Sequence, residues 1–183
     1  MRLNGAPDDY LQQRSRALIN NWMPVIASAA DLATVPDLLE ANGDEFCACE
    51  DLRPEIVAAA CRDGFLPMGL VLPGLPLLLV KSHHQRTVLD FRRLHVQRNA
   101  RRYARGLSIY VDLHFADTLA TLVERHGDDW LIPPLVDAFA ALHQRPRNGV
   151  RTHSVEVYHG DTVVAGEVGY CSRNVYTSLS GFH

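Results

Sequence analysis

The sequence predicts an α/β or α+β fold in which helices flank a mixed β-sheet. Two observations carry this prediction. Between residues 51 and 143, segments with helical spacing of apolar residues alternate with short segments of strand character. From residue 153 onward, three short alternating segments follow one another and are separated by turn residues, which is typical of antiparallel strands. The change from the first pattern to the second defines the fold class.

Composition limits the classes of protein that the chain can represent. The 183 residues fit one domain, or one domain with a small appendage, and the composition is that of an ordinary globular protein rather than a disordered or fibrous one. Apolar runs such as Leu77–Val80 are far shorter than the ~20 residues of a membrane span. No apolar leader is seen near the N-terminus, so we expect a cytoplasmic protein.

The four cysteines do not form a recognisable metal or redox motif. Cys47 and Cys49 are separated by a single residue, and no second pair follows them. We therefore expect free thiols, no metal site and no cofactor.

The N-terminal half is expected to contain two longer helices and a short one between them. Apolar spacing predicts a helix over 9–30 that Pro24 interrupts, followed over 31–50 by a loop with one short helix. A second helix is expected with Asp51 as N-cap and Gly64 at its end. Residues 65–69 read as a turn. We accordingly divide the chain into an N-terminal extension, 1–50, and a main domain, 51–183.

The remaining elements follow from periodicity and turn chemistry. Helices are predicted at 96–105, 114–126 and 135–143, and strands at 77–81, 107–112, 153–158, 162–170 and 175–180. Gly166 and Gly169 lie inside one of these strands. Because glycine weakens a strand, two of them indicate that another group approaches the backbone closely there.

Arginines are concentrated between residues 86 and 105. This window contains seven arginines and a single acid, Asp90, although the whole chain has a net charge of −3. On the predicted helix, one face would carry the four arginines Arg98, Arg101, Arg102 and Arg105. Like charges on one face favour an anionic partner such as the phosphates of a nucleic acid. The alternative is a solvated basic face.

Several segments in order resemble the leucyl/phenylalanyl-tRNA-protein transferase family. The central one reads His153-Ser154-Val155-Glu156-Val157-Tyr158 and is followed by the glycine-rich strand around Gly166 and Gly169. Upstream are Trp130-Leu131-Ile132, a helix that ends in Leu142-His143, the segment Gly64-Phe65-Leu66-Pro67-Met68, and Leu94-His95-Val96 with Arg98. The resemblance covers residues from about Asp51 to the C-terminus.

The resemblance implies a fold and an activity. The fold would be that of the N-acetyltransferase superfamily without its last strands, because the family continues beyond the strand that ends near Gly181. The activity would be transfer of leucine or phenylalanine from a charged tRNA to the N-terminal amine of acceptor proteins that start with Arg or Lys. Arg86, Arg98, Arg101, Arg102 and Arg105 would bind the tRNA.

The resemblance also implies a set of site residues. Glu156 would be the catalytic-site carboxylate, which binds the terminal adenosine or the incoming N-terminus. The substrate-binding residues would be Met68, Trp130, Phe139, Val168, Tyr170 and Leu179. Met68 stands where the family commonly has an aromatic residue. A methionine can pack on an adenine or a substrate side chain, but it lacks the flat surface on which an adenine could stack. The alternatives are that Met68 and Trp130 are core residues and that Glu156 forms a structural ion pair with an arginine.

Three functions remain open at this point. The first is the transferase; we expect the chain to bind better than it catalyses, and to self-associate through an open sheet edge. The second is a tRNA-binding relative without catalytic activity. The third is a coenzyme-A-dependent N-acyltransferase, although the sequence lacks the pyrophosphate-binding loop Gln/Arg-x-x-Gly-x-Gly/Ala.

Overall fold

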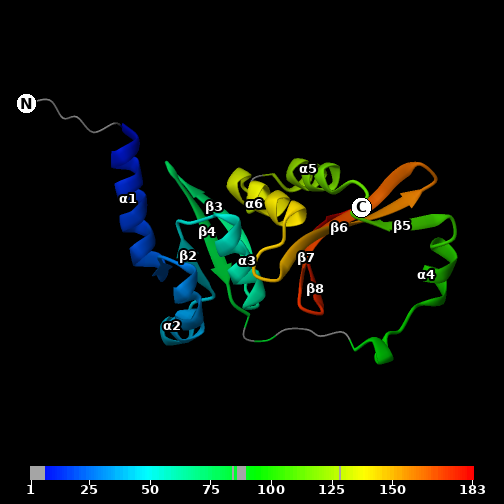
Figure 1. The fold of residues 1–183 in the computed structure, drawn as a ribbon, viewed down its shortest axis with the longest axis horizontal. Helices are drawn as coiled ribbons and strands as arrows, with labels where there is room; N and C mark the ends of the chain where they lie inside the picture. Colours follow the sequence, from blue (N-terminus) through cyan, green and yellow to red (C-terminus); the bar gives the residue numbers. More distant parts are fainter. Residues whose placement is uncertain (1–6, 84, 86–89, 128) are drawn as a thin grey trace, which may run out of the picture.

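The computed structural model describes residues 7–83, 85, 90–127 and 129–183 (Figure 1). The helices are α1 (Pro7–Trp22), α2 (Val35–Asn42), α3 (Pro54–Arg62), α4 (Arg98–Tyr103), α5 (Phe115–His126) and α6 (Pro133–Gln144), with 3₁₀ turns η1 (Ala29–Thr34) and η2 (Phe91–Arg93). The strands are β1 (Val25–Ile26), β2 (Phe46–Cys49), β3 (Leu66–Leu72), β4 (Leu75–Lys81), β5 (Leu107–Val111), β6 (Val150–His159), β7 (Thr162–Ser172) and β8 (Val175–Phe182).

The strands form two four-stranded sheets. The first has the order β1-β2-β4-β3, with β1 and β2 parallel and the other pairs antiparallel. The second has the order β5-β6-β7-β8 and is antiparallel throughout. The prediction of an α+β fold is confirmed, with helices packed against two sheets rather than against one mixed sheet.

The second sheet confirms the predicted run of three C-terminal strands. Gly160 turns the chain from β6 to β7 with a φ of 59°, and Arg173 turns it from β7 to β8 with a φ of 55°. A Cβ at Gly166 would lie 2.7 Å from the ring of Phe182, and one at Gly169 would lie 2.5 Å from the Tyr176 hydroxyl. The close approach that the two glycines indicated is therefore made by β8: by the Phe182 ring at Gly166, and by the Thr177 carbonyl oxygen and the Tyr176 side chain at Gly169.

Helices α5 and α6 cover one face of the second sheet (Figure 1). Their apolar spacing places Phe115, Leu119 and Leu122 of α5, and Leu135, Phe139 and Leu142 of α6, in the core. Helix α3, with six consecutive buried residues from Ile56 to Cys61, packs against α6, β3 and β6. The main core therefore extends from the first sheet through α3 to the second sheet.

A backbone contact joins the first sheet to the segment that leads into α6. The Gly69 N–H donates to the Trp130 carbonyl oxygen over 2.6 Å. A Cβ at Gly69 would collide with the Trp130 oxygen and the Ile132 side chain. Glycine is required here because no side chain fits at this seam.

The expected turn over 65–69 is wrong. These residues enter strand β3, where Pro67 pairs with Val80 and Met68 with Leu79. Strand β3 is an edge strand, and an edge tolerates a proline because its missing N–H can face away from the partner. Proline and glycine therefore suggested a turn where the chain forms an edge strand.

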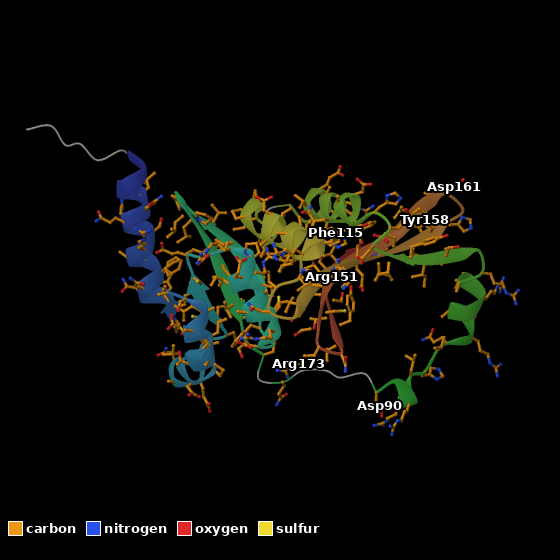
Figure 2. The ribbon with its side chains drawn as sticks, in the orientation of Figure 1. Asp90, Phe115, Arg151, Tyr158, Asp161 and Arg173 are labelled. Atoms are coloured by element: carbon orange, nitrogen blue, oxygen red, sulfur yellow. The ribbon has the colours of Figure 1, made fainter. Side chains whose placement is uncertain are left out.

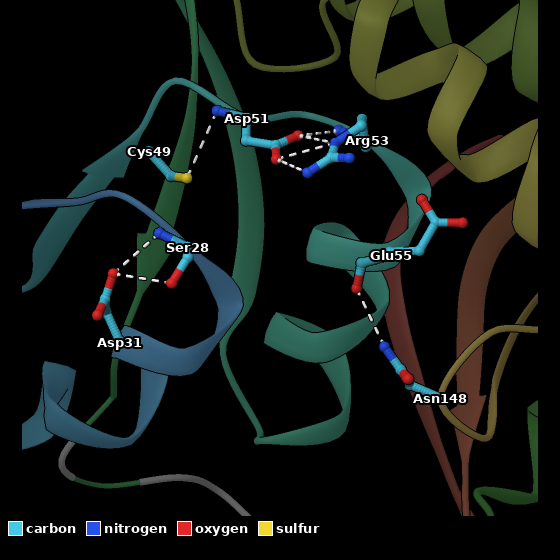
Figure 3. Close-up of polar contacts among 7 residues, drawn as sticks. All are labelled: Ser28, Asp31, Cys49, Asp51, Arg53, Glu55 and Asn148. Atoms are coloured by element: carbon cyan, nitrogen blue, oxygen red, sulfur yellow. Dashed lines mark hydrogen bonds and ion pairs between the residues drawn. The ribbon is translucent and has the colours of Figure 1, made fainter.

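Two further differences concern residues 31–54. The segment predicted as a loop with a short helix also contains β2, which pairs with β4. Helix α3 begins at Pro54, and Asp51 does not cap it; the Asp51 carboxylate accepts the Arg53 backbone N–H and guanidinium instead (Figure 3). In the part of the chain that the structure describes, no helix is long and apolar enough to span a membrane.

Candidate functional site

Glu156 is a fully buried carboxylate on β6. Side chains at Thr152, Ser154 and Glu156 point toward α5 and α6 because alternate residues of a strand share a face, and all three are inaccessible to solvent. Glu156 Oε1 accepts the Thr118 hydroxyl over 3.1 Å, and Oε2 accepts the Leu113 N–H over 3.3 Å. The carboxylate thus has one donor from α5 and one from the segment before it.

The surroundings of Glu156 supply a helix N-terminus but, among the described residues, no positively charged side chain. Thr118 lies in the first turn of α5, so the carboxylate is near the helix N-terminus, where the macrodipole stabilises negative charge. Within the described residues, Glu156 has no arginine, lysine or histidine partner. The alternative of a structural ion pair between Glu156 and an arginine is therefore wrong for the described part of the chain.

Asp112 fixes the segment that supplies one of these donors. It has a φ of 61°, a left-handed conformation that aspartate tolerates better than most residues. Its N–H donates to the Ser154 carbonyl over 3.0 Å, and its Oδ1 accepts the Ser154 N–H over 2.9 Å. Its Oδ2 lies 2.7 Å from His153 Nδ1. Asp112 therefore holds Leu113, the next residue, against Glu156.

Imidazoles lie close to Asp112 from both faces of the sheet. His143 of α6 has its Nδ1 3.1 Å from the Thr152 carbonyl and 3.8 Å from Asp112 Oδ1. The Phe115 ring stacks on the His143 imidazole with centroids 3.9 Å apart and an interplanar angle of 4°. The sequence analysis missed this cluster because its members are far apart in the chain; the aspartate at the end of a predicted strand was its only local signal.

Four of the six predicted substrate-binding residues surround one small closed space. Trp130, Phe139, Val168 and Leu179 line it together with Leu119, Leu122, Leu131 and Ser180. The gap between these side chains is too narrow to hold a water molecule. In this conformation the four residues form part of the core rather than an open pocket.

The other two predicted substrate-binding residues lie apart from this space. Tyr170 is buried, and its hydroxyl lies 3.5 Å from the Phe65 carbonyl oxygen. Met68 is half-buried on β3, beside Gly69, whose N–H binds the Trp130 carbonyl. The backbone hydrogen bond of Gly69, the residue after Met68, therefore brings Met68 and Trp130 to the same seam.

A wide cavity in the described part of the chain contains none of the predicted site residues. It measures about 940 Å³ and lies between β1, the segment 50–54 and α6. A second groove of about 540 Å³ runs between α5 and α6 and is lined by Asp112, Leu113, Phe115 and His143 among others. This second groove lies next to Glu156, because Leu113 both lines the groove and donates its N–H to the Glu156 carboxylate.

Four of the five predicted tRNA-binding arginines belong to an arm that runs from α4 into β5, whose course Figure 1 shows. Arg98, Arg102 and Arg105 are exposed, and none of them has an ion-pair partner among the residues described. Helix α4 ends at Tyr103, so Arg105 lies beyond it and the expected helix over 96–105 is too long at both ends. Arg101 belongs to α4 but its side chain is not described, and Arg86 lies outside the described residues.

The cysteines and histidines do not assemble into a metal site where the structure describes them. Cys47, Cys49 and Cys61 are buried free thiols, and Cys171 is a partly exposed one. Burial raises the pKa of the Cys47 thiol to about 11, and it also raises the pKa of Cys61. Cys47 and Cys61 are therefore protonated at neutral pH and unsuited to nucleophilic chemistry.

Comparison with known proteins identifies the relatives of this chain. A sequence model of the leucyl/phenylalanyl-tRNA protein transferase family matches residues 88–183. A protein named leucyl/phenylalanyl-tRNA–protein transferase from Nitratidesulfovibrio vulgaris strain DP4 is 33% identical over 160 residues, which is 84% of this chain and 65% of the relative. The protein of that name from Stutzerimonas stutzeri A1501 is 35% identical over 150 residues, covering 79% of this chain and 63% of the relative.

A third relative with the same name, from Pectobacterium atrosepticum, is 28% identical over 138 residues, or 70% of this chain and 56% of the relative. The chain thus spans less than two thirds of the length of these relatives. The matched region contains Glu156, both of its donors and the α4–β5 arm. By these matches, the chain belongs to the leucyl/phenylalanyl-tRNA protein transferase family.

Proposed function

We propose that this chain is an aminoacyltransferase that moves leucine or phenylalanine from a charged tRNA to the N-terminal amine of proteins beginning with Arg or Lys. The observation that carries the proposal is the buried Glu156 carboxylate, held by Leu113 and Thr118 within the region that the family model matches. A buried carboxylate without a cationic partner is costly. This cost is offset if a donor group of the substrate completes the hydrogen bonds of the Glu156 carboxylate.

In the proposed reaction the acceptor amine attacks the ester carbonyl that links the amino acid to the tRNA. A C–N bond forms, the C–O bond to the ribose breaks, and the proton lost by nitrogen passes to the departing ribose oxygen. Glu156 would orient the amine or the terminal adenosine by accepting a hydrogen bond, which places the reactants for attack. No cofactor is needed, because the ester supplies the driving force.

Substrate holding would be shared by two surfaces. The arginines Arg98, Arg102 and Arg105, with Arg86 and Arg101, would bind tRNA phosphates. The apolar residues Met68, Trp130, Phe139, Val168, Tyr170 and Leu179 would hold the leucyl or phenylalanyl side chain. Since the space among four of these residues is closed, substrate would have to separate α5 and α6 from β8 in order to enter.

That closed space favours a second candidate function, a tRNA-binding protein that does not transfer amino acids. Glu156 has no solvent exposure, and the apolar space beside β8 admits no side chain without rearrangement. The exposed arginines would still bind RNA in such a protein. The two functions differ in catalysis alone.

Transfer of labelled leucine or phenylalanine from charged tRNA to an arginine-initiated peptide tests the proposal. We expect product with the parent chain, and a roughly 10- to 1,000-fold lower rate in the Glu156→Gln variant, which keeps shape but loses charge. The transferase from Nitratidesulfovibrio vulgaris serves as the positive control. A parent chain that binds tRNA but yields no product contradicts the transferase function and supports the binding protein.

The setting of the protein is also part of the proposal. We place it in the cytoplasm, where charged tRNA is available.

Strand β5 is exposed along its whole length, and β8 is the other edge of the same sheet, so self-association would occur by edge pairing. Sedimentation over a range of concentrations checks this; a mass that stays at one chain contradicts it.

A further inference from the structure

Two tyrosines form an exposed pair beside Glu156. Tyr110 of β5 lies directly opposite Glu156 of β6, and Tyr158 lies two residues farther along β6 on the same face. The two rings meet edge to face, with centroids 5.5 Å apart and planes at 90°. Tyr110 is 45% exposed, and Tyr158 is partly exposed near the β6–β7 hairpin (Figure 2). The pair therefore presents aromatic surface to solvent.

The charge around this pair favours a neutral, flat ligand group. Glu156 and Asp117 are the carboxylates close enough to Tyr158 to act on it; burial first, then these two charges, raise the pKa of its phenol. Negative charge at this point repels phosphate. A nucleobase, which has a π face and exocyclic amines but no charge, suits the tyrosines and the carboxylates together.

Positive charge lies a short distance along the same arm. Arg105 precedes Tyr110 by five residues, so at most about 18 Å of chain separates them. Arg98 and Arg102 follow the same arm away from the tyrosines on α4. Proteins that bind single strands commonly combine arginines along the backbone path with aromatic rings on which the bases stack.

We propose that Tyr110 and Tyr158 form a stacking platform for an unpaired base of an RNA whose phosphates bind the α4 arginines. The inference rests on the proposed tRNA binding and adds to it the site of the single-stranded end. It places the base next to Glu156, which the acceptor end of a charged tRNA must approach for transfer. The platform carries no formal charge, so it contributes stacking and not phosphate contacts.

Binding of two RNA hairpins tests the platform without any aminoacyl chemistry. One hairpin has a short single-stranded 3′ extension, and the other has the same stem with a blunt end. We expect the parent chain to prefer the extended hairpin, and Tyr110→Ala to weaken its binding roughly 5- to 100-fold while binding of the blunt hairpin stays unchanged. Tyr110→Phe keeps the ring and should bind within about twofold of the parent.

Salt dependence separates stacking from charge. Tyr110→Ala and Tyr158→Ala should leave the slope of log Kd against log salt unchanged, since no cation is removed. Ile109→Ala is the matched control: Ile109 is the preceding residue of β5, is 68% exposed and points to the opposite face of the sheet. It should bind both hairpins as the parent does.

The platform is overturned if Tyr110→Ala and Tyr158→Ala bind the extended hairpin as tightly as the parent, or if both hairpins are weakened equally. It is also overturned if the parent does not prefer the extended hairpin. A tyrosine-dependent preference in a chain that transfers no amino acid supports the platform and contradicts the transferase function alone.

Discussion

Arginines in two regions of this molecule are used in opposite ways. In the region of the first sheet each of three exposed arginines has an acidic partner: Arg16 lies 2.7 Å from Glu50, Arg53 2.6 Å from Asp51 and Arg62 2.8 Å from Asp63. On the α4–β5 arm, Arg98, Arg102 and Arg105 have no such partner among the described residues.

The difference teaches where an anionic ligand can bind. An arginine that already contacts a carboxylate projects little net charge, and such exposed pairs add little to stability. Three unpaired arginines on one exposed arm create a local positive field although the chain is net negative. We therefore expect substitutions in the first region to change stability or to have no effect. Substitutions of the arm arginines should change RNA binding.

The largest effect is expected from Gly69→Ala, which damages the first region without altering charge. The added methyl would collide with the Trp130 carbonyl oxygen, which is backbone and cannot swing aside. We expect the free energy of unfolding to fall by about 3 kcal/mol. Chemical denaturation measures it, with Val71→Ala, an exposed position two residues farther along the same strand, as the control. Equal stability of Gly69→Ala and the parent would show that the seam is not tightly packed.

The next effect is expected from removing the charge of the arm. The triple variant Arg98→Gln, Arg102→Gln, Arg105→Gln should bind tRNA roughly 100-fold more weakly at physiological salt, because about three phosphate contacts are lost. Its salt slope should fall by about 2.7. Titrations at several salt concentrations measure both. Thermal unfolding should not change, and a loss of stability in this variant would mean that the arginines support the fold.

The sequence predicted the regular, local parts of this fold well. Alternation between turn residues located β6, β7 and β8, and apolar spacing located α5 and α6. Strands β1 and β2 were missed because they are two and four residues long and pair with segments distant in sequence. The division of the chain at residue 50 stays a prediction; β2 and β4 share a sheet across it.

The candidate site was predictable only in part, for a similar reason. Glu156 could be named from its motif, and the arginines from their local density. The groups that bind Glu156 could not, because Thr118 and Leu113 are 38 and 43 residues away and meet it only through the packing of α5 on β6. The left-handed conformation of Asp112 has no sequence signature, since most aspartates do not adopt it.

A pH effect is expected from a buried thiol of the first region. The pKa of buried Cys47 is raised to about 11 from a usual value of 9.0, so the thiol ionises first in the unfolded chain. The free energy of unfolding is therefore unaffected below pH 9 and falls between about pH 9 and 11, by about 2 kcal/mol. Denaturation at a series of pH values measures this fall. Cys47→Ala should make the fall shallower, with the remainder due to buried Cys49 and Cys61; an equally steep fall would assign the whole effect to other groups.

The smallest effect is expected from the paired arginines, and it tests the comparison most directly. The double variant Arg53→Gln, Arg62→Gln removes two exposed cations that lie against Asp51 and Asp63 (Figure 3 shows the first pair). Because both arginines are exposed and surface ion pairs add little to stability, the melting temperature should barely change, and tRNA affinity should stay within about twofold of the parent. The same two titrations used for the arm measure it. If each paired arginine weakened binding as much as each arm arginine, the RNA would be responding to total charge. The α4–β5 arm would then not be a specific binding site for the RNA phosphates.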